Sequence, residues 1–407
     1  MKFVVIGGGI AGLACARKIR EVEKNSEVVI LSEEKKPYPK IVLPYLLAGK
    51  IKEKDLWLDI PQGVAFLHQR VVKVLPDQNV VVTTTEEFRF DRLLIASGAR
   101  AVVPDFEGNT SPFIFTVRNL SDISGIRTRL KKAGQRRIVI SGAGPVSVEV
   151  GDALRKLGYK PIFLVSSQRI LSMILDEDGS ETLIEGLPKR EVEMHFGENI
   201  KRVKARKEGV SVETESGREF KGDLVISGKG ISPNLDFLSS SSIEISQGVV
   251  VDEFLRTNKT GVFAAGDVCQ AYDIVHREKR INALWPVAIE QGRYAAMNML
   301  DLNIPYIGSI PMNIITAFGN TIFTAGLSAI EGLETYRRRE ERKFSKVSLR
   351  NGKLVGVIFL NIGIDPGVYL FAMEKEIEVS GLKDVLLSGE LSYNHLHSVS
   401  KTRELRT

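Results

Sequence analysis

Residues 4–12 read VVIGGGIAG, and this short stretch decides the fold of the first part of the chain. An apolar strand runs into a glycine turn, and a helix opens directly behind it. Gly7, Gly9 and Gly12 have GxGxxG spacing: the first permits a tight turn, the second lets the backbone approach a pyrophosphate, and the third lets helix and strand pack closely. Unpaired N–H groups at the helix N-terminus favour an anion there. The stretch therefore predicts a βαβ unit that binds a dinucleotide.

An acidic residue should follow the second strand of such a unit, where it holds the ribose hydroxyls. Residues 28–34 read VVILSEE, so Ser32 stands at the usual acidic position and Glu33 comes next. Either side chain could make the contact, and we favour Glu33.

A second informative stretch lies far downstream. Residues 257–267 read TNKTGVFAAGD, an apolar strand that ends in Gly266 and Asp267. A carboxylate at the end of a buried strand is costly unless something pairs with it. A sugar hydroxyl is one suitable partner, and a helix that Asp267 would cap is the other. We favour the sugar hydroxyl, which makes Asp267 a candidate cofactor ligand.

The order of strand, glycine turn, helix and strand repeats in the middle of the chain. Residues 137–149 read RIVISGAGPVSVE, with the first two glycines in place and Ser147 where the third would stand. Residues 164–171 read LVSSQRIL, so Ser166 replaces the expected acid. A carboxylate there repels a 2′-phosphate, and its loss removes a reason to prefer NADH. The choice between NADH and NADPH stays open.

Two βαβ units, each followed by antiparallel-looking strands, predict an α/β protein with two nested Rossmann-like folds and parallel sheets. After Leu302 short alternating runs appear, with Asn351-Gly352 as a hairpin turn, and they predict a C-terminal α+β domain. The tail after Ser392 has little apolar periodicity, and we expect poor order there. The predicted domains are a discontinuous dinucleotide-binding domain at 1–108 and 238–302, an NAD(P)H-binding domain at 109–237, and an interface-type domain at 303–407.

Composition narrows the class of protein further. At 407 residues the chain is too long for one compact core, and 43% hydrophobic and 26% charged residues are ordinary for a soluble globular protein. No apolar run could span a bilayer, and the first residues enter a strand directly, so we expect a cytoplasmic protein without membrane contact. The net charge of +6 fits a solvated surface better than nucleic-acid binding. The two cysteines, Cys15 and Cys269, form no CxxC pair, which excludes a dithiol centre and a cysteine-rich metal site.

The pairing of the first glycine turn with Asp267 resembles the FAD site of the FAD-dependent pyridine nucleotide-disulfide oxidoreductase superfamily. Trp285-Pro286, followed by a helix over residues 287–300, extends the resemblance. It implies that FAD lies on the first glycine turn, with Asp267 at its ribitol. It also implies that the N-terminus of the 287–300 helix points at the flavin, where positive potential stabilises the reduced form.

Other segments match the same superfamily less completely. Ser97-Gly98-Ala99 stands where the family has Thr-Gly-Ala, which implies a further backbone contact to FAD. The resemblance implies NADH or NADPH at the second glycine turn, with Glu149 between nicotinamide and flavin. Lys229 replaces an apolar residue of the family, and it faces either the pyridine nucleotide or solvent.

The most useful departure from the family is a missing thiol. Residues 38–49 read YPKIVLPYLLAG, and Ile41 stands where similar coenzyme A-disulfide reductases and NADH peroxidases carry a redox cysteine. Reduction of peroxides or disulfides through a cysteine is therefore disfavoured. The chain is most similar to the branch without this thiol, which includes rubredoxin reductase, the flavoprotein of NAD(P)H-nitrite reductase and NADH oxidase. Lys40 is the nearest cation, and it faces either the flavin N5 region or solvent.

We therefore expect an FAD-dependent oxidoreductase that passes hydride from NAD(P)H to flavin and then electrons to a rubredoxin-like protein or a small oxidant. The alternative is an FAD-binding subunit of a multi-subunit dehydrogenase with a vestigial NAD(P) domain. Expected partners are an acidic electron-transfer protein such as rubredoxin and a second copy of the chain, and no metal is expected. The candidate catalytic residues are Lys40 and Glu149. The candidate cofactor-binding residues are Gly7, Gly9, Ile10, Ala11, Gly12, Ser32, Glu33, Lys40, Ala96, Ser97, Gly98, Gly266, Asp267, Trp285, Pro286, Gly142, Gly144, Pro145, Val146, Ser166 and Gly230.

Overall fold

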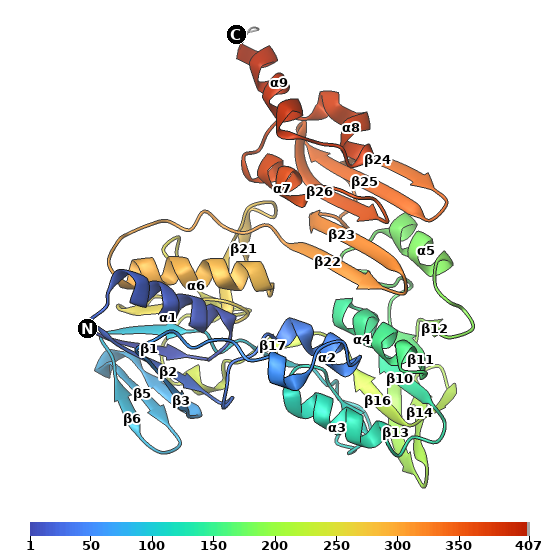
Figure 1. Cartoon of the computed structure of the whole chain (residues 1–407), viewed down its shortest axis with the longest axis horizontal. Coiled ribbons are helices and arrows are strands. Elements are labelled where there is room, and N and C mark those ends of the chain that lie inside the picture. The colour runs from blue at the N-terminus through green and yellow to red at the C-terminus, as the bar shows by residue number, and fades with distance from the viewer. Residues whose placement is uncertain (405–407) are drawn as a thin grey trace. The chain divides into compact units, whose positions relative to one another are not determined.

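The computed structural model describes residues 1–404, with side chains through residue 398, and Figure 1 labels its elements. The chain forms two compact units, each built from three segments of sequence. The first unit comprises Met1–Val42, Ile51–Arg100 and Ile231–Ser309, and the second comprises Leu43–Lys50, Ala101–Gly230 and Ile310–Thr407. The second unit thus holds most of the predicted NAD(P)H-binding domain together with the C-terminal domain. The assignment of one cofactor to each domain stays a prediction.

A parallel sheet forms the core of the first unit. Its elements are β1 (Lys2–Ile6), β2 (Glu27–Ser32), β3 (Val64–His68), β7 (Arg92–Ile95) and β19 (Val262–Ala264), with helices α1 (Ile10–Val22) and α6 (Trp285–Met299). The strand order is β19-β7-β1-β2-β3, and every pair is parallel. The central strands are buried at successive residues, as expected for a parallel sheet covered on both faces. Helices α1 and α6 pack against each other. Because β19, β7 and β1 are adjacent and parallel, the turns that follow them meet at one edge of the sheet.

Short strands complete the first unit. One antiparallel sheet contains β4 (Val71–Leu75), β5 (Val80–Thr83) and β6 (Glu87–Arg89). A mixed sheet contains β18 (Val249–Val250), β20 (Cys269–Asp273) and β21 (Glu278–Arg280), in which β20 pairs with β18 in parallel and with β21 antiparallel. β17 (Ile231–Pro233) pairs with β8 (Ala99–Ala101).

The second unit contains a similar parallel sheet. Its elements are β9 (Ile114–Phe115), β10 (Arg137–Ser141), β11 (Lys160–Val165), β12 (Glu193–Phe196) and β16 (Leu224–Ser227), with helices α2 (Leu43–Leu47), α3 (Leu120–Leu130) and α4 (Pro145–Lys156). The strand order is β12-β11-β10-β16-β9, and all pairs are parallel. An antiparallel sheet of β13 (Ile200–Arg206), β14 (Gly209–Thr214) and β15 (Glu219–Gly222) follows. Together with the sheet of the first unit, this arrangement confirms the predicted α/β fold class with two Rossmann-like folds.

The C-terminal part of the second unit is an antiparallel sheet covered by helices. Its strands are β22 (Met312–Ala317), β23 (Asn320–Gly326), β24 (Glu334–Glu340), β25 (Lys343–Arg350) and β26 (Lys353–Leu360), and they lie in the order β22-β23-β26-β25-β24. Helices α7 (Pro366–Glu374) and α8 (Lys383–Ser388) pack on it. Asn351 and Gly352 join β25 to β26 with φ angles of 53° and 74°. Two positive φ angles are what a two-residue hairpin turn requires, which confirms the predicted hairpin.

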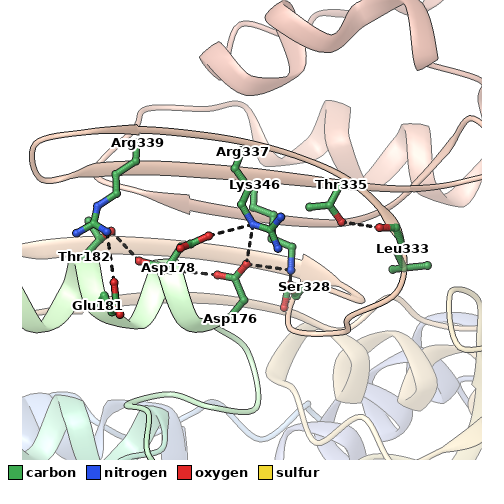
Figure 2. A network of polar contacts seen from close by, with 11 residues as sticks. Asp176, Asp178, Glu181, Thr182, Ser328, Leu333, Thr335, Arg337, Arg339 and Lys346 are labelled. Atoms are coloured by element: carbon green, nitrogen blue, oxygen red, sulfur yellow. Dashed lines mark hydrogen bonds and ion pairs between the residues drawn. The ribbon is translucent and has the colours of Figure 1, made fainter.

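A buried ion network fixes helix α5 (Glu177–Glu185) to this sheet, as Figure 2 shows. Lys346 of β25 is only 1% exposed, and its Nζ lies 3.1 Å from Oδ2 of Asp176 and donates to the Ser328 carbonyl oxygen at 2.8 Å. Arg337 of β24 lies 3.4 Å from the same Asp176 oxygen and 3.1 Å from Asp178. Buried charges are tolerated when they are paired and hydrogen-bonded in this way.

The prediction of poor order after Ser392 is wrong for the residues that follow it directly. They form helix α9 (Tyr393–Glu404), and residues 405–407 of the predicted tail lie outside the described residues. The Ser392 backbone N–H donates to Nδ1 of His395, three residues on, at 3.2 Å, as in the reciprocal half of a capping box. No helix within residues 1–404 is both long and apolar enough to cross a membrane.

Candidate functional site

The first glycine turn has the geometry that its sequence predicts. Gly7 has a φ of 109°, and a Cβ built on it would lie 2.1 Å from the Ala96 carbonyl oxygen. A Cβ on Gly12 would lie 2.1 Å from the Gly7 carbonyl oxygen, so only glycine allows α1 to start this close to β1. A Cβ on Gly9, in contrast, would meet no atom within 4 Å. Gly9 therefore presents bare backbone to open space, which is the surface that a pyrophosphate needs.

The end of β2 places the two ribose candidates differently. A Cβ on Gly8 would lie 2.7 Å from the Ser32 hydroxyl and 2.6 Å from the Phe66 ring, so Ser32 adjoins the glycine turn. Ser32 is buried, and its Oγ accepts a hydrogen bond from the Glu34 backbone N–H at 3.1 Å. Glu33 is exposed and pairs with Arg70 at 3.4 Å. The choice of Glu33 over Ser32 as the ribose ligand stays a prediction.

The structure brings the aspartate segment to the first glycine turn. A Cβ on Gly266 would lie 3.0 Å from the Cβ of Ala11, in the first turn of α1. The Gly266 N–H donates to Oε1 of Gln291 at 2.8 Å, and Gln291 is a buried residue of α6. The two stretches that the sequence separates so widely thus share one edge of the sheet, and Asp267 follows directly on Gly266.

The turn after β7 lies at the same edge. The Ser97 hydroxyl donates to the Asn234 carbonyl oxygen at 2.9 Å, and the Asn234 side-chain amide donates to the Ser97 carbonyl oxygen at 2.9 Å. Gly98 has a φ of 67°, and a Cβ on it would meet nothing within 4 Å. Asn234 thus holds the carbonyl oxygens of Ser97 and Gly98, while the Cα of Gly98 faces open space.

Three helices begin at the candidate cofactor turns, and none of them has a side-chain cap. They are α1 behind Gly9, α4 behind Gly144, and α6 behind Leu284, and no acidic residue occupies their first turns. In contrast, Asp176 caps α5, and Asp365 caps α7 through the Gly367 N–H at 3.0 Å, although α8 also begins without a side-chain cap. Uncapped N–H groups with a positive helix end are a ready anion site. The residues present therefore fit the phosphates and the electron-rich ring edge of dinucleotide cofactors.

The second glycine turn keeps this geometry despite its serine. Gly142 has a φ of 101°, and a Cβ on it would lie 2.4 Å from the Gly228 carbonyl oxygen. A Cβ on Gly144 would meet nothing within 4 Å, and Pro145 opens α4 with its fixed φ. Ser147 is buried, and its Oγ lies 3.5 Å from the Gly228 carbonyl oxygen. Ser147 fits here because Gly228, the residue it contacts, has no side chain. The second turn therefore forms even though Ser147 replaces the third glycine of the fingerprint.

The lysine beside this turn is anchored rather than free. Nζ of Lys229 donates to Oδ1 of Asn199 at 3.2 Å, and its Cδ would lie 3.7 Å from a Cβ on Gly142. Burial lowers the pKa of Lys229. Gly230 follows with a φ of 91°, and Ser166 comes directly after β11 without a carboxylate beside it in sequence. Lys229 therefore lies beside the second glycine turn.

Glu149 has a partner that sequence reasoning missed. The Tyr45 hydroxyl, on α2, lies 3.5 Å from Oε1 of Glu149, on α4, and the two helices pack together. Burial raises the pKa of Glu149 to about 7, and the Tyr45 hydrogen bond opposes part of that rise. Burial and the nearby carboxylate raise the pKa of Tyr45 as well. Glu149 can therefore gain or lose a proton near neutral pH, a property that is enriched at functional sites.

The thiols and Lys40 occupy different surroundings. Ile41 is 53% exposed, and the absence of a redox cysteine at this position stays a prediction. Cys15 and Cys269 are both 0% exposed, and burial raises the pKa of each thiol well above its usual range. A buried neutral thiol is a poor nucleophile. Lys40 is half-buried in a short 3-10 turn, Lys40–Val42, and its flavin contact stays a prediction.

Sequence reasoning predicted the glycines and Asp267 but not the residues that support them. Gln291 lies within a helix that the sequence did predict, yet nothing local shows that it bonds Gly266. The sequence showed Tyr45 only as the last residue of Leu43-Pro44-Tyr45 and gave no sign of its contact with Glu149. Both act through contacts between segments far apart in the chain, and a single sequence does not carry that signal.

Comparison with known proteins agrees with this geometry. The sequence model of the family described as pyridine nucleotide-disulphide oxidoreductase matches residues 1–292, which include both glycine turns and Asp267. The chain is 24% identical over 390 residues to an NADH oxidase of Methanocaldococcus jannaschii, covering 88% of this chain and 86% of that protein. It is 25% identical over 405 residues to the NADH-dependent phenylglyoxylate dehydrogenase subunit epsilon of Aromatoleum evansii, covering 96% of both. The fold is similar to that of putidaredoxin reductase in a covalent complex with putidaredoxin, with a TM-score of 0.88, 21% identity, and 98% and 99% of the two chains covered.

Proposed function

This chain belongs to the pyridine nucleotide-disulphide oxidoreductase family, and we propose from this premise that it delivers electrons from NAD(P)H to an acceptor outside the chain without using a thiol of its own. It is an NAD(P)H-dependent FAD oxidoreductase, as its family and relatives show. The acceptor and the route that the electrons take to it are the proposed part.

The first unit holds FAD in this proposal. Gly9 and the uncapped start of α1 would bind its pyrophosphate, and Asp267 would accept hydrogen bonds from ribitol hydroxyls. The start of α6, at Trp285-Pro286, supplies a positive helix end for the electron-rich edge of the ring. When bound, FAD supplies a redox centre that accepts hydride from NAD(P)H and can pass electrons on singly or in pairs.

The second unit holds the nicotinamide nucleotide. Gly144 and the uncapped start of α4 would bind its pyrophosphate, and Lys229 lies beside that turn with a positive charge. Because Ser166 carries no charge, the residue that follows β11 does not repel a 2′-phosphate, and we propose that NADPH is accepted as well as NADH. Glu149 holds or releases a proton near neutral pH, which suits a residue that contacts the nicotinamide.

The absence of a usable thiol carries the proposal about the acceptor. Ile41 replaces the redox cysteine, and burial keeps both cysteines neutral within the core. Disulfide reduction requires a thiolate that can form a mixed disulfide, so this chain would not reduce disulfides in that way. An electron-transfer protein of the rubredoxin or ferredoxin class, or a small oxidant such as O2, needs no thiol. The association of putidaredoxin reductase with its partner supports the protein acceptor.

Anaerobic stopped-flow absorbance tests this proposal directly. The flavin absorbance of the FAD-loaded protein should bleach on mixing with NADH or NADPH. The bleached protein should then regain its colour on mixing with oxidised rubredoxin, ferredoxin or O2, and should stay bleached with coenzyme A disulfide. Rapid recovery with coenzyme A disulfide would contradict a thiol-free route. A Cys15→Ser/Cys269→Ser variant that behaves as the parent would complete the evidence against a thiol.

A second candidate function has a specific observation in its favour. The subunit epsilon relative matches this chain over 96% of both lengths, and its name places it in a multi-subunit dehydrogenase. We propose as the alternative that this chain is an FAD-binding subunit whose own NAD(P) domain is vestigial. Flavin that never bleaches with NADH or NADPH, yet is reduced when a partner dehydrogenase is added, would favour the alternative. A homodimer and a cytoplasmic location both stay predictions.

A further inference from the structure

A basic cavity opens at the edge of the second unit's parallel sheet that lies opposite the second glycine turn. Its volume is about 420 Å³, and its lining includes Arg136, Arg137, Arg155, Lys160, Arg190 and Tyr159. Arg137 and Lys160 are the first residues of β10 and β11 and pair in register, whereas the glycine turn follows the last residue of β10. The cavity is therefore separate from the nucleotide site.

The carboxylates around the cavity do not balance its cations. Glu193 lies 3.4 Å from Arg137 and 2.7 Å from Lys160, so one acid serves two cations. Glu191, the one carboxylate in the lining, pairs with Arg155 at 2.7 Å. Within residues 1–398, Arg136 and Arg190 are exposed and have no acidic partner. The cavity thus keeps two guanidinium groups available for an external anion.

A buried carboxylate holds the loop that carries Arg136. Asp223 accepts hydrogen bonds from the backbone N–H groups of Gly134 at 3.0 Å, Gln135 at 3.1 Å and Arg137 at 3.1 Å. Arg136, between Gln135 and Arg137, has a φ of 52°, and its carbonyl oxygen accepts a hydrogen bond from the Lys160 backbone N–H at 2.7 Å. The backbone of Arg136 is therefore fixed at the cavity before any ligand arrives, which lowers the cost of binding.

Tyr159 forms an aromatic wall beside this arginine. The Arg136 guanidinium lies 6.0 Å from the centre of the Tyr159 ring, and the Tyr159 hydroxyl donates to the Leu130 carbonyl oxygen at 3.1 Å. This distance is the outer limit of a cation–π contact, so the N–H groups of the guanidinium stay free for an anion. Gly158 allows the approach, since a Cβ there would lie 3.3 Å from Nη1 of Arg136.

We propose that this cavity binds a small phosphorylated anion, held by Arg136 and Arg190. Planar guanidinium groups match phosphate oxygens two at a time, and a cavity of this size suits a small-molecule ligand. The ligand is either an inorganic polyphosphate or the phosphate part of a nucleotide, and both share the same recognition chemistry.

Isothermal titration of the FAD-loaded protein, with NAD⁺ present and ionic strength held constant, tests the site. The probes are inorganic pyrophosphate and ADP. The informative variant is Arg136→Gln/Arg190→Gln, and the control is Arg17→Gln/Arg89→Gln, which removes the same charge from exposed arginines outside the cavity. FAD content and the unfolding midpoint show whether each variant is folded. Since the altered side chains are exposed, we expect both to match the parent.

Saturable binding of one pyrophosphate or ADP per chain by parent and control, at least tenfold weaker in the cavity variant, would support the proposal. Tighter binding of ADP than of pyrophosphate would identify a nucleotide as the ligand. Equal affinity for the two probes would identify a polyphosphate. Equal affinity in all three proteins, or an equal loss in the control, would overturn it. Binding of polyglutamate without binding of pyrophosphate would also overturn it, because the cations would then form a surface for an acidic protein.

Discussion

The Tyr45 hydroxyl lies 3.5 Å from Oε1 of Glu149, although 104 residues separate the two in sequence. Tyr45 belongs to α2, and Glu149 belongs to α4, the helix behind the second glycine turn. The tyrosine–carboxylate pair is therefore a group of the second unit that can hold a proton near neutral pH.

The raised pKa of Glu149 predicts a pH-dependent stability. Its carboxyl is ordinary in the unfolded chain, with a pKa of 4.5, and burial raises the value to about 7 in the folded protein. Between these values the folded state keeps a proton that the unfolded state has lost, so the free energy of unfolding falls as pH rises. Relative to Glu149→Gln, the parent should lose about 3 kcal/mol between pH 4.5 and pH 7.5. Urea unfolding at several pH values, without added nicotinamide nucleotide, measures the difference, and parallel curves would contradict it.

Removing the tyrosine hydroxyl should move this transition upward in pH. The Tyr45 hydrogen bond lowers the pKa of Glu149, so Tyr45→Phe leaves burial unopposed. We expect the pH at which Glu149 titrates to rise, seen both in urea unfolding and in the pH dependence of flavin bleaching by NADH. Tyr272→Phe changes an exposed tyrosine and serves as the control. A shift of the same size in both variants would show that the contact does not set the pKa.

Local signals allowed much of the site to be predicted, and long-range contacts account for what was missed. Gly7 and Gly142 need positive φ angles whatever surrounds them, so the sequence alone identifies their turns. Gln291 gives no such signal, because a glutamine in a helix usually faces solvent and this one faces Gly266. The prediction of poor order directly after Ser392 was wrong because the sequence of helix α9 shows little apolar periodicity.

The contact between Gln291 and Gly266 should support FAD binding. Gln291→Leu leaves the buried Gly266 N–H without an acceptor, which costs roughly 1–3 kcal/mol. The turn before Asp267 then loses its support, and we expect both a lower free energy of unfolding and a lower ratio of flavin to protein absorbance. Gln247→Leu alters an exposed glutamine of the same unit and should change neither. Full FAD content in Gln291→Leu would contradict the role given to this residue.

The second glycine turn should depend on a matched pair of small residues. A Cβ on Gly228 would lie 1.8 Å from the Ser147 hydroxyl oxygen, a distance that forces one of the two segments to move. We expect Gly228→Ala to destabilise the protein by about 1–3 kcal/mol and to weaken NADH binding, since the turn would be displaced. Ser147→Gly removes the obstructing hydroxyl, so the double variant should regain most of both losses. Additive losses in the double variant would show that the two residues do not interact.

The ion network of Figure 2 should hold α5 to the C-terminal sheet. Lys346→Met leaves the buried Asp176 carboxylate with Arg337 as its remaining cation, and removal of one partner from a buried pair typically costs about 3 kcal/mol or more. Lys343→Met changes an exposed lysine of the same strand and should cost little. Asp176→Asn keeps a side chain that can cap α5 and removes the charge, so Asp176→Asn/Lys346→Met should be more stable than Lys346→Met alone. Urea unfolding measures all three variants, and a Lys346→Met protein as stable as Lys343→Met would show that the network is not a source of stability.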